Sequence, residues 1–130
     1  MSNELILAIS GNDIFSGGGL HADLATYTTN KQHGFVAVTC LTAMTEHGFE
    51  VIPVDPTTFA QQLNSLKDVP FSAIKLGLLP NVQVADLALD YLKAHAEIPV
   101  VLDPVLVCKE SHDVEVSALR DELIKFFPYV

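Results

Sequence analysis

The sequence predicts an α/β fold of three layers, in which a mainly parallel sheet lies between two layers of helices. Short apolar runs rich in β-branched residues alternate with longer segments whose apolar residues recur at helical spacing. Short connections join these segments, and such alternation is typical of a parallel sheet with helices on both faces. The 130 residues are 49% hydrophobic and 18% charged, which indicates a single domain with a packed core.

The first half of the chain contains these expected elements: strands at residues 4–10, 34–43 and 49–54, and a helix at residues 18–31. The run over 34–43 is apolar and β-branched almost throughout, so we expect one strand covered on both faces. Asp55 and Pro56 predict the start of the next helix, with Asp55 as N-cap and Pro56 in the first helical position.

The second half continues the same alternation. Residues 70–76 predict a strand that ends at Gly77, and Asn81 predicts the N-cap of the following helix. Residues 99–103 predict another buried strand. A last helix is marked by four apolar residues at helical spacing: Val116, Leu119, Leu123 and Phe127.

Charge and cysteine content narrow the range of partners. The net charge is −9, with 7 basic against 16 acidic residues, so nucleic acid and anionic membranes are poor partners. No apolar run approaches the roughly 20 residues of a spanning helix, and the first residues lack the basic region of a signal peptide. Cys40 and Cys108 lie in separate apolar segments, which favours reduced thiols in a cytoplasmic protein.

The most distinctive stretch is residues 10–23, where a strand runs through three glycines into a helix. Such a turn presents free backbone N–H groups and the positive end of the helix dipole to a ligand. Asp13 and Asp23 bracket the turn. The amides would suit a phosphate, whereas the carboxylates would suit a hydroxyl, a ring N–H or a metal. The stretch also fits a plain strand-to-helix connection with a solvated aspartate at each end.

Ligands of parallel sheets bind at the carboxyl ends of the strands. The residues that we expect there are Asn12, Asp13, Thr42, Ala43, Met44, Gly77, Leu78, Asp103, Pro104, Cys108 and Lys109. Lys75 is expected to point into the sheet. Four of the five histidines are expected at the surface, and His21 is retained as a candidate because it follows the glycine turn.

Four motifs occur in a characteristic order: AISGNDIFSGGGLHADLATY, VTCLTAM, IKLGLLP and VVLDPVLVCK. Together they resemble the vitamin-kinase branch of the ribokinase-like superfamily, which holds the pyridoxine/pyridoxal kinases and the hydroxymethylpyrimidine (phosphate) kinases. Met44 stands where the pyrimidine kinases usually carry glutamine, and the DPVLVCK run is similar to the pyridoxal-phosphorylating members. The resemblance implies ATP- and Mg²⁺-dependent phosphorylation of the hydroxymethyl group of a small-molecule vitamer, by a cytoplasmic homodimer.

The resemblance also implies residue roles. Asp23 matches the aspartate that hydrogen-bonds the ring substituents, and Asp103 matches the carboxylate close to the magnesium and phosphates, with Lys109 beside it. The remaining residues matched to the substrate site are Asp13, Gly18, Gly19, Met44, Leu78 and Cys108.

Two departures from the family pattern stand out. The bulkier pair Ile14-Phe15 occupies the loop, and Glu110 replaces the glycine that commonly follows the lysine. The resembling enzymes are also longer, so we expect residues 1–130 to be the substrate-binding half of a kinase. The ATP-binding half and the catalytic base would be missing, and these residues alone would not transfer phosphate. A hydroxymethylpyrimidine kinase and a non-catalytic flavodoxin-like binding module are the alternatives.

Overall fold

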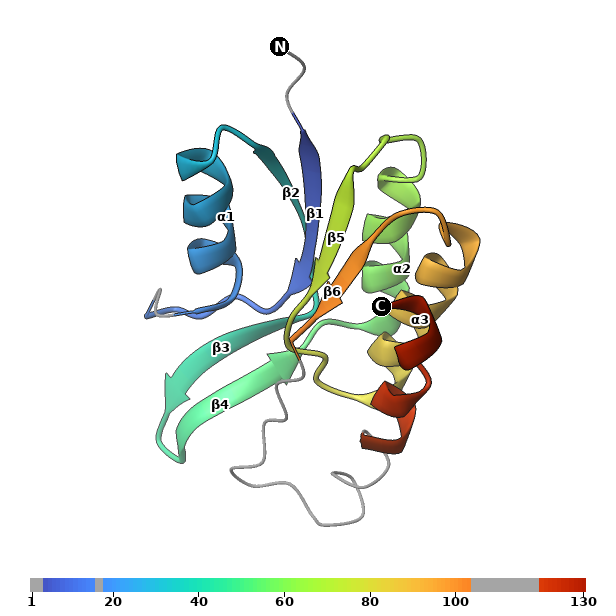
Figure 1. The fold of residues 1–130 in the computed structure, drawn as a ribbon. Helices are drawn as coiled ribbons and strands as arrows, with labels where there is room; N and C mark the ends of the chain where they lie inside the picture. The colour runs from blue at the N-terminus through green and yellow to red at the C-terminus, as the bar shows by residue number, and fades with distance from the viewer. Residues whose placement is uncertain (1–3, 16–17, 104–119) are drawn as a thin grey trace.

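The computed structural model describes residues 4–15, 18–103 and 120–130. Its main sheet consists of four parallel strands: β1 (Leu5–Ser10), β2 (His33–Val38), β5 (Ala73–Leu76) and β6 (Val100–Leu102). These strands lie in the order β2-β1-β5-β6, so β1 and β5 are the inner pair (Figure 1). The parallel α/β class predicted from the sequence is confirmed.

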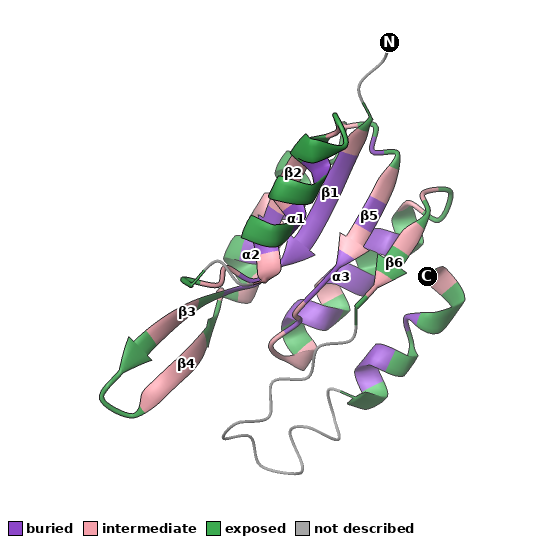
Figure 2. Cartoon of the chain, turned by 60° about the vertical axis from the view of Figure 1, so that its left-hand side comes forward, coloured by how far each residue is buried: buried purple, intermediate pink, exposed green. Residues whose placement is uncertain are grey.

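Helices cover both faces of this sheet. They are α1 (Gly19–Thr29) on one face, and α2 (Pro56–Ser65) and α3 (Val82–Ala94) on the other (Figure 1). Successive residues of a strand point to opposite faces, and β1 uses both. Leu7 and Ile9 belong to the core under α2 and α3, whereas Ile6 and Ala8 pack with α1. Figure 2 shows β1 buried along almost its whole length, as expected of an inner strand in a three-layer fold.

The predicted strand over residues 34–43 is wrong in one respect, because the structure divides it into two strands in different sheets. At Thr39 the chain leaves the parallel sheet: its amide donates to the Ser10 carbonyl, and its hydroxyl donates to the Leu78 carbonyl at 2.6 Å. The next residues form a separate antiparallel ribbon of β3 (Cys40–Thr45) and β4 (Gly48–Pro53) (Figure 1). An unbroken apolar run predicts strand conformation but does not show where the chain changes partner.

Two predicted helix starts are confirmed. The Asp55 carboxylate accepts hydrogen bonds from the amides of Thr57 at 3.0 Å and Thr58 at 3.4 Å, with Pro56 in the first turn. Asn81 caps α3 by accepting from the Val84 amide at 2.9 Å. Each cap satisfies amides that the helix itself leaves without a partner.

The end of the chain differs from its predicted pattern. Residues 120–124 are helical and are followed by a short 3-10 helix, η1 (Phe127–Tyr129). Leu123 is buried as predicted, but Phe127 is 63% exposed and Phe126 is buried instead. The α-helical spacing stops before Phe127, because the chain turns into η1 around Pro128. Val116 and Leu119 lie outside the described residues.

Strand β6 is also more open than predicted. Val101 is 65% exposed, whereas Val100 and Leu102 pack against the core under α2 and α3. β6 is an edge strand of the described sheet, and its α1-side face lacks a covering helix there. A search of the described helices finds none with the length and apolar character needed to cross a membrane.

Candidate active site

A cavity of about 320 Å³ lies at the carboxyl ends of the parallel strands. The glycine turn before α1, the inner side of the β3–β4 ribbon and the segments after β5 and β6 form its walls. The eight lining residues that the sequence predicted for the strand ends or the site are Asn12, Asp13, Gly18, Gly19, Thr42, Gly77, Leu78 and Asp103. The expectation that the strand ends form one site is therefore supported by their common position.

The glycine turn depends on one unusual backbone conformation. Gly19 has a φ of +60°, in the left-handed region that side chains with a Cβ rarely adopt. A Cβ at Gly19 would overlap the Gly11 carbonyl oxygen, which accepts a hydrogen bond from the Leu20 amide at 3.1 Å. The first turn of α1 is thereby fixed against the end of β1.

Thr42 fastens the glycine turn to the ribbon. Its hydroxyl donates to the Asn12 carbonyl at 2.9 Å and accepts from the Ile14 amide at 3.0 Å. The Asn12 amide also donates to the Cys40 carbonyl at 3.0 Å. Because the Thr42 hydroxyl both donates to and accepts from the backbone of the loop, the position of the loop depends on that of β3. Thr42 lines the cavity as well.

Cys40 lies directly behind the loop and is fully buried. Burial raises the pKa of its thiol, and the hydrogen bond from Thr39 only partly offsets that effect. A buried thiol with a raised pKa holds little thiolate near neutral pH, so Cys40 is a packing residue rather than a nucleophile.

Lys75 departs most clearly from its predicted position. It was expected to point into the sheet, but it lines the cavity, and its ammonium forms an ion pair with the carboxylate of Asp23. The Asp23 side chain is only 7% exposed and that of Lys75 is 29% exposed. Lys75 therefore contacts both the cavity and the buried carboxylate of Asp23. The pair was not predicted, because its two members are 52 positions apart in the sequence. The one feature that could have indicated it is a lysine within an inner strand.

The surroundings of Asp23 also perturb Tyr27, one turn later on α1. Burial, and secondarily the negative charge of Asp23, raise the pKa of Tyr27 to about 12. Neither the Tyr27 hydroxyl nor the second carboxylate oxygen of Asp23 has a hydrogen-bond partner in the described part of the chain. Asp23 is thus a buried carboxylate whose neutralising group is Lys75.

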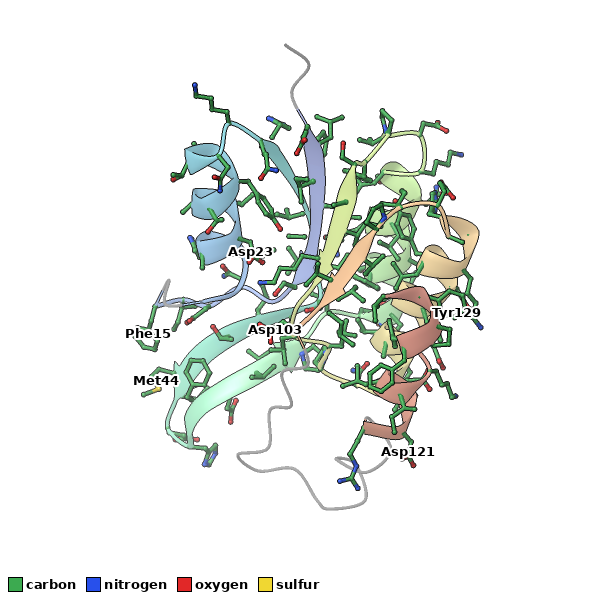
Figure 3. All side chains as sticks on the ribbon, viewed as in Figure 1. Phe15, Asp23, Met44, Asp103, Asp121 and Tyr129 are labelled. Atoms are coloured by element: carbon green, nitrogen blue, oxygen red, sulfur yellow. The ribbon has the colours of Figure 1, made fainter. Side chains whose placement is uncertain are left out.

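The remaining predicted site residues have mixed outcomes. Met44 is not among the residues that line the cavity and is 63% exposed. It lies opposite Phe49 on the outer part of the ribbon (Figure 3), because two further residues of β3 carry the chain away from Thr42. His21 is exposed on α1. Cys108 and Lys109 lie outside the described residues.

Phe49 was not among the predicted site residues, yet it lines the cavity. Its ring stacks on Phe15 with 6.1 Å between centroids, which adds an aromatic wall on the ribbon side. The exposed ring of Phe15 therefore lies against a residue of the cavity wall.

Asp103 is the residue best placed to hold a magnesium ion. It directly follows β6, its amide donates to the Leu76 carbonyl at 2.9 Å, and its side chain is exposed at the cavity. The carboxylate of Asp13 is partly engaged, since one oxygen accepts from the Phe15 amide at 3.0 Å. Among the described residues no three potential ligands cluster. One or two carboxylates still fit Mg²⁺, because its other ligands are usually waters and substrate phosphates.

Comparison with known families identifies the architecture. Residues 13–130 match the family described as phosphomethylpyrimidine kinase. The chain belongs to this family. Among curated relatives, it is 35% identical over 131 residues to the pyridoxine kinase of Bacillus subtilis, covering 95% of this chain and 48% of the relative. It is 33% identical over 130 residues to a hydroxymethylpyrimidine/phosphomethylpyrimidine kinase of Synechococcus elongatus, covering 95% and 49%.

Solved structures agree with this membership of the phosphomethylpyrimidine kinase family. An ADP complex of Bacillus subtilis pyridoxal kinase has a TM-score of 0.80 and 34% identity, covering 94% of this chain and 49% of that one. The Staphylococcus aureus pyridoxal kinase in complex with pyridoxal has a TM-score of 0.82 and 28% identity, covering 97% and 46%. The chain thus spans about half the length of these relatives.

Proposed function

We propose that the chain supplies the vitamer-binding site of a kinase that phosphorylates the 5′-hydroxymethyl group of pyridoxal, pyridoxine or pyridoxamine with Mg²⁺ and ATP. The observation that carries this proposal is the cavity, which brings the glycine turn, Lys75 and Asp103 together at the carboxyl ends of the strands. Its volume of about 320 Å³ lies within the usual range for small-molecule sites. The pyridoxine and pyridoxal kinases among the relatives support the choice of substrate.

Each wall of the cavity has a proposed task. The glycine turn and Leu78 would hold the ring, since glycines let the backbone approach and Leu78 offers an apolar side chain. Asp103 would stand on the side of the magnesium and the phosphates, where a carboxylate holds the cation and positions the transferring group. ATP chemistry supplies the phosphoryl group, and the residues of this chain orient the hydroxymethyl acceptor.

We also propose that residues 1–130 form one domain, equivalent to the substrate-binding half of the longer relatives. Phosphoryl transfer requires positioning and stabilisation of the developing charge. In the described residues the one glycine turn at a helix start belongs to the vitamer side of the cavity. We therefore expect the chain to bind vitamers without turning over ATP by itself.

A direct binding experiment tests the proposal. The full chain is titrated calorimetrically with pyridoxine, pyridoxal and hydroxymethylpyrimidine, with biotin as an unrelated vitamin control. Saturable binding of pyridoxine or pyridoxal at one site per chain is expected, with weaker binding of the pyrimidine. Binding of the pyrimidine alone would favour the second candidate function below. Absence of binding by all three would contradict a vitamer site.

The second candidate is a hydroxymethylpyrimidine or phosphomethylpyrimidine kinase. The relative from Synechococcus elongatus favours it, as does the solved phosphomethylpyrimidine kinase of Clostridium difficile, with a TM-score of 0.80 at 26% identity, covering 96% of this chain and 55% of that one. In this candidate the same cavity would hold a pyrimidine. The titration above separates the two by their relative affinities.

A homodimer is a further part of the proposal. Large apolar side chains are exposed on the ribbon and the adjoining loop: Ile14, Phe15, Leu41, Met44 and Ile52. Leu41 and Ile52 are cross-strand partners on one face of the ribbon, whereas Met44 lies on the other face. Exposed apolar side chains gathered on one element favour a contact between proteins. Sedimentation of the purified chain over a range of concentrations tests this, and a monomer at every concentration would rule it out.

A further inference from the structure

The position of Lys75 follows from the alternation of β5. Ile74 and Leu76 pack into the core under α2 and α3, so Lys75 between them faces the α1 side of the sheet. On that face the neighbouring residues are Ala8 of β1 and Val101 of β6. Ala8 is small, which leaves room for the lysine chain to reach α1.

The ammonium group of Lys75 is fixed rather than free. Its ion pair with Asp23 joins β5 to α1, and the carboxylate is almost fully buried. A lysine ammonium carries three N–H donors and no acceptor. In the described part of the chain Asp23 is the one side-chain partner recorded for Lys75, so donors remain for a molecule in the cavity. A cation held in place loses little conformational freedom when such a molecule binds.

The charges around the cavity show what this ammonium would bind. The charged side chains that line the cavity within the described residues are Asp13, Lys75 and Asp103. Lys75 is therefore the cation of the described lining, and both carboxylates repel an anionic oxygen. An oxygen on a bound ring would therefore accept a hydrogen bond from the ammonium of Lys75. A positively charged or donor-only substituent would be disfavoured there.

We propose that Lys75 is a specificity-determining residue, which recognises an oxygen substituent on the ring of the bound vitamer, and that Asp23 is a positioning residue that holds it. This inference rests on the proposed vitamer site and deepens it. Pyridoxine carries a ring hydroxyl that is acidified by the ring nitrogen, so it offers a partly anionic oxygen. Hydroxymethylpyrimidine carries an amino group instead, and no oxygen is attached directly to its ring. Lys75 thus favours the pyridoxine class of substrate.

The test compares ligands that differ only in the ring hydroxyl. Dissociation constants for pyridoxine and 3-deoxypyridoxine are measured calorimetrically on the full chain and on the variants Lys75→Arg and Lys75→Met. The wild type should prefer pyridoxine, and Lys75→Met should weaken pyridoxine binding by roughly 10- to 100-fold, the range for a hydrogen bond to a charged group. Binding of 3-deoxypyridoxine should stay within about twofold. Lys75→Arg retains a charged donor and should restore most of the preference.

Two controls keep the result interpretable. Lys75→Met leaves Asp23 buried without its cation, which is strongly destabilising, so the double variant Asp23→Asn with Lys75→Met removes both charges. It should fold, as monitored by circular dichroism, and show the same loss of preference for the hydroxyl. Lys67→Met replaces an exposed lysine that precedes the amino end of β5 and should change neither affinity.

The outcomes separate this inference from the proposed function. If the wild type binds neither pyridoxine nor its deoxy analogue, the vitamer site itself is wrong and the role of Lys75 falls with it. If the wild type binds both ligands but the folded double variant keeps the preference for the hydroxyl, the site stands and the role of Lys75 is refuted. An equal loss for both ligands would show that the ion pair only supports the fold.

Discussion

Replacing Gly19 by alanine tests the geometry on which the candidate site depends. At a φ of +60° an L-residue pays about 1–2 kcal/mol for the left-handed conformation. The new methyl group would also overlap the Gly11 carbonyl oxygen, and the Gly11 carbonyl carbon and Asp13 amide nitrogen would lie 3.4 and 3.6 Å away. Forcing a methyl group into a packed position costs about 1–3 kcal/mol. The free energy of unfolding should therefore fall by about 2–5 kcal/mol.

Gly18 provides the matched control one position earlier. Its φ of −159° is ordinary extended backbone, and a Cβ there would have no neighbour within 4 Å. Gly18→Ala should therefore change the free energy of unfolding by no more than about 0.5 kcal/mol. Urea denaturation followed by circular dichroism measures both variants by linear extrapolation.

The two variants should also differ in binding. In Gly19→Ala the Gly11 carbonyl has to move, and it is part of the cavity wall, so pyridoxine affinity should fall together with stability. The reasoning is refuted if Gly19→Ala is as stable as the wild type. It is refuted equally if Gly18→Ala loses as much stability as Gly19→Ala, because the effect would then come from loss of any glycine.

Three further predictions concern single side chains. Burial and the neighbouring Asp86 raise the pKa of Glu122, which means that the folded protein favours the protonated side chain. Protonated Glu122 therefore stabilises the fold below the ordinary carboxyl pKa, and this stabilisation is lost as the pH rises through the raised pKa. Glu122→Gln should accordingly melt at a higher temperature than the wild type at pH 7, with the difference vanishing near pH 4; an unchanged melting temperature at pH 7 contradicts this. Tyr27→Phe removes a buried hydroxyl without a partner in the described residues, so urea denaturation should show stability unchanged or higher by about 1 kcal/mol, and a clear loss would reveal an overlooked partner. Thr42→Val removes the two hydrogen bonds of the glycine turn and should weaken pyridoxine binding about fivefold in calorimetry, whereas equal affinity would mean that the loop is held by other contacts.

Much of the fold could be predicted because it depends on local chemistry. The caps at Asp55 and Asn81 are specified by one side chain and the amides next to it, so they can be recognised from a few residues. The strand–helix alternation likewise predicts a parallel sheet through the rule for short connections. The glycine turn can be recognised for the same reason, since three successive glycines between an apolar run and a helical stripe are typical of a tight strand-to-helix turn.

The wrong predictions involve relations between distant residues. The division of residues 34–43 into two sheets depends on Thr39 finding partners in Ser10 and Leu78, which the local pattern does not encode. The role of Lys75 depends on which face of β5 is covered by which helix. Met44 was placed at the cavity by its position at the end of the predicted strand over residues 34–43 and by the resemblance. It lies outside the cavity lining because the ribbon carries it away, and the direction of the ribbon has no sequence signal.

The candidate site and the exposed edge of the sheet have one structural cause. Helices α2 and α3 cover one face of the sheet, whereas α1 packs mainly on β1 and β2 and reaches β5 through Ala73 and Lys75, so the α1-side face of β6 has no helix over it in the described residues. Val101 is exposed on that face and Lys75 reaches across it to Asp23. A helix at this position would bury Val101, but it would also close the cavity. Without such a helix less apolar surface is buried, but a vitamer ring can reach both the glycine turn and Lys75.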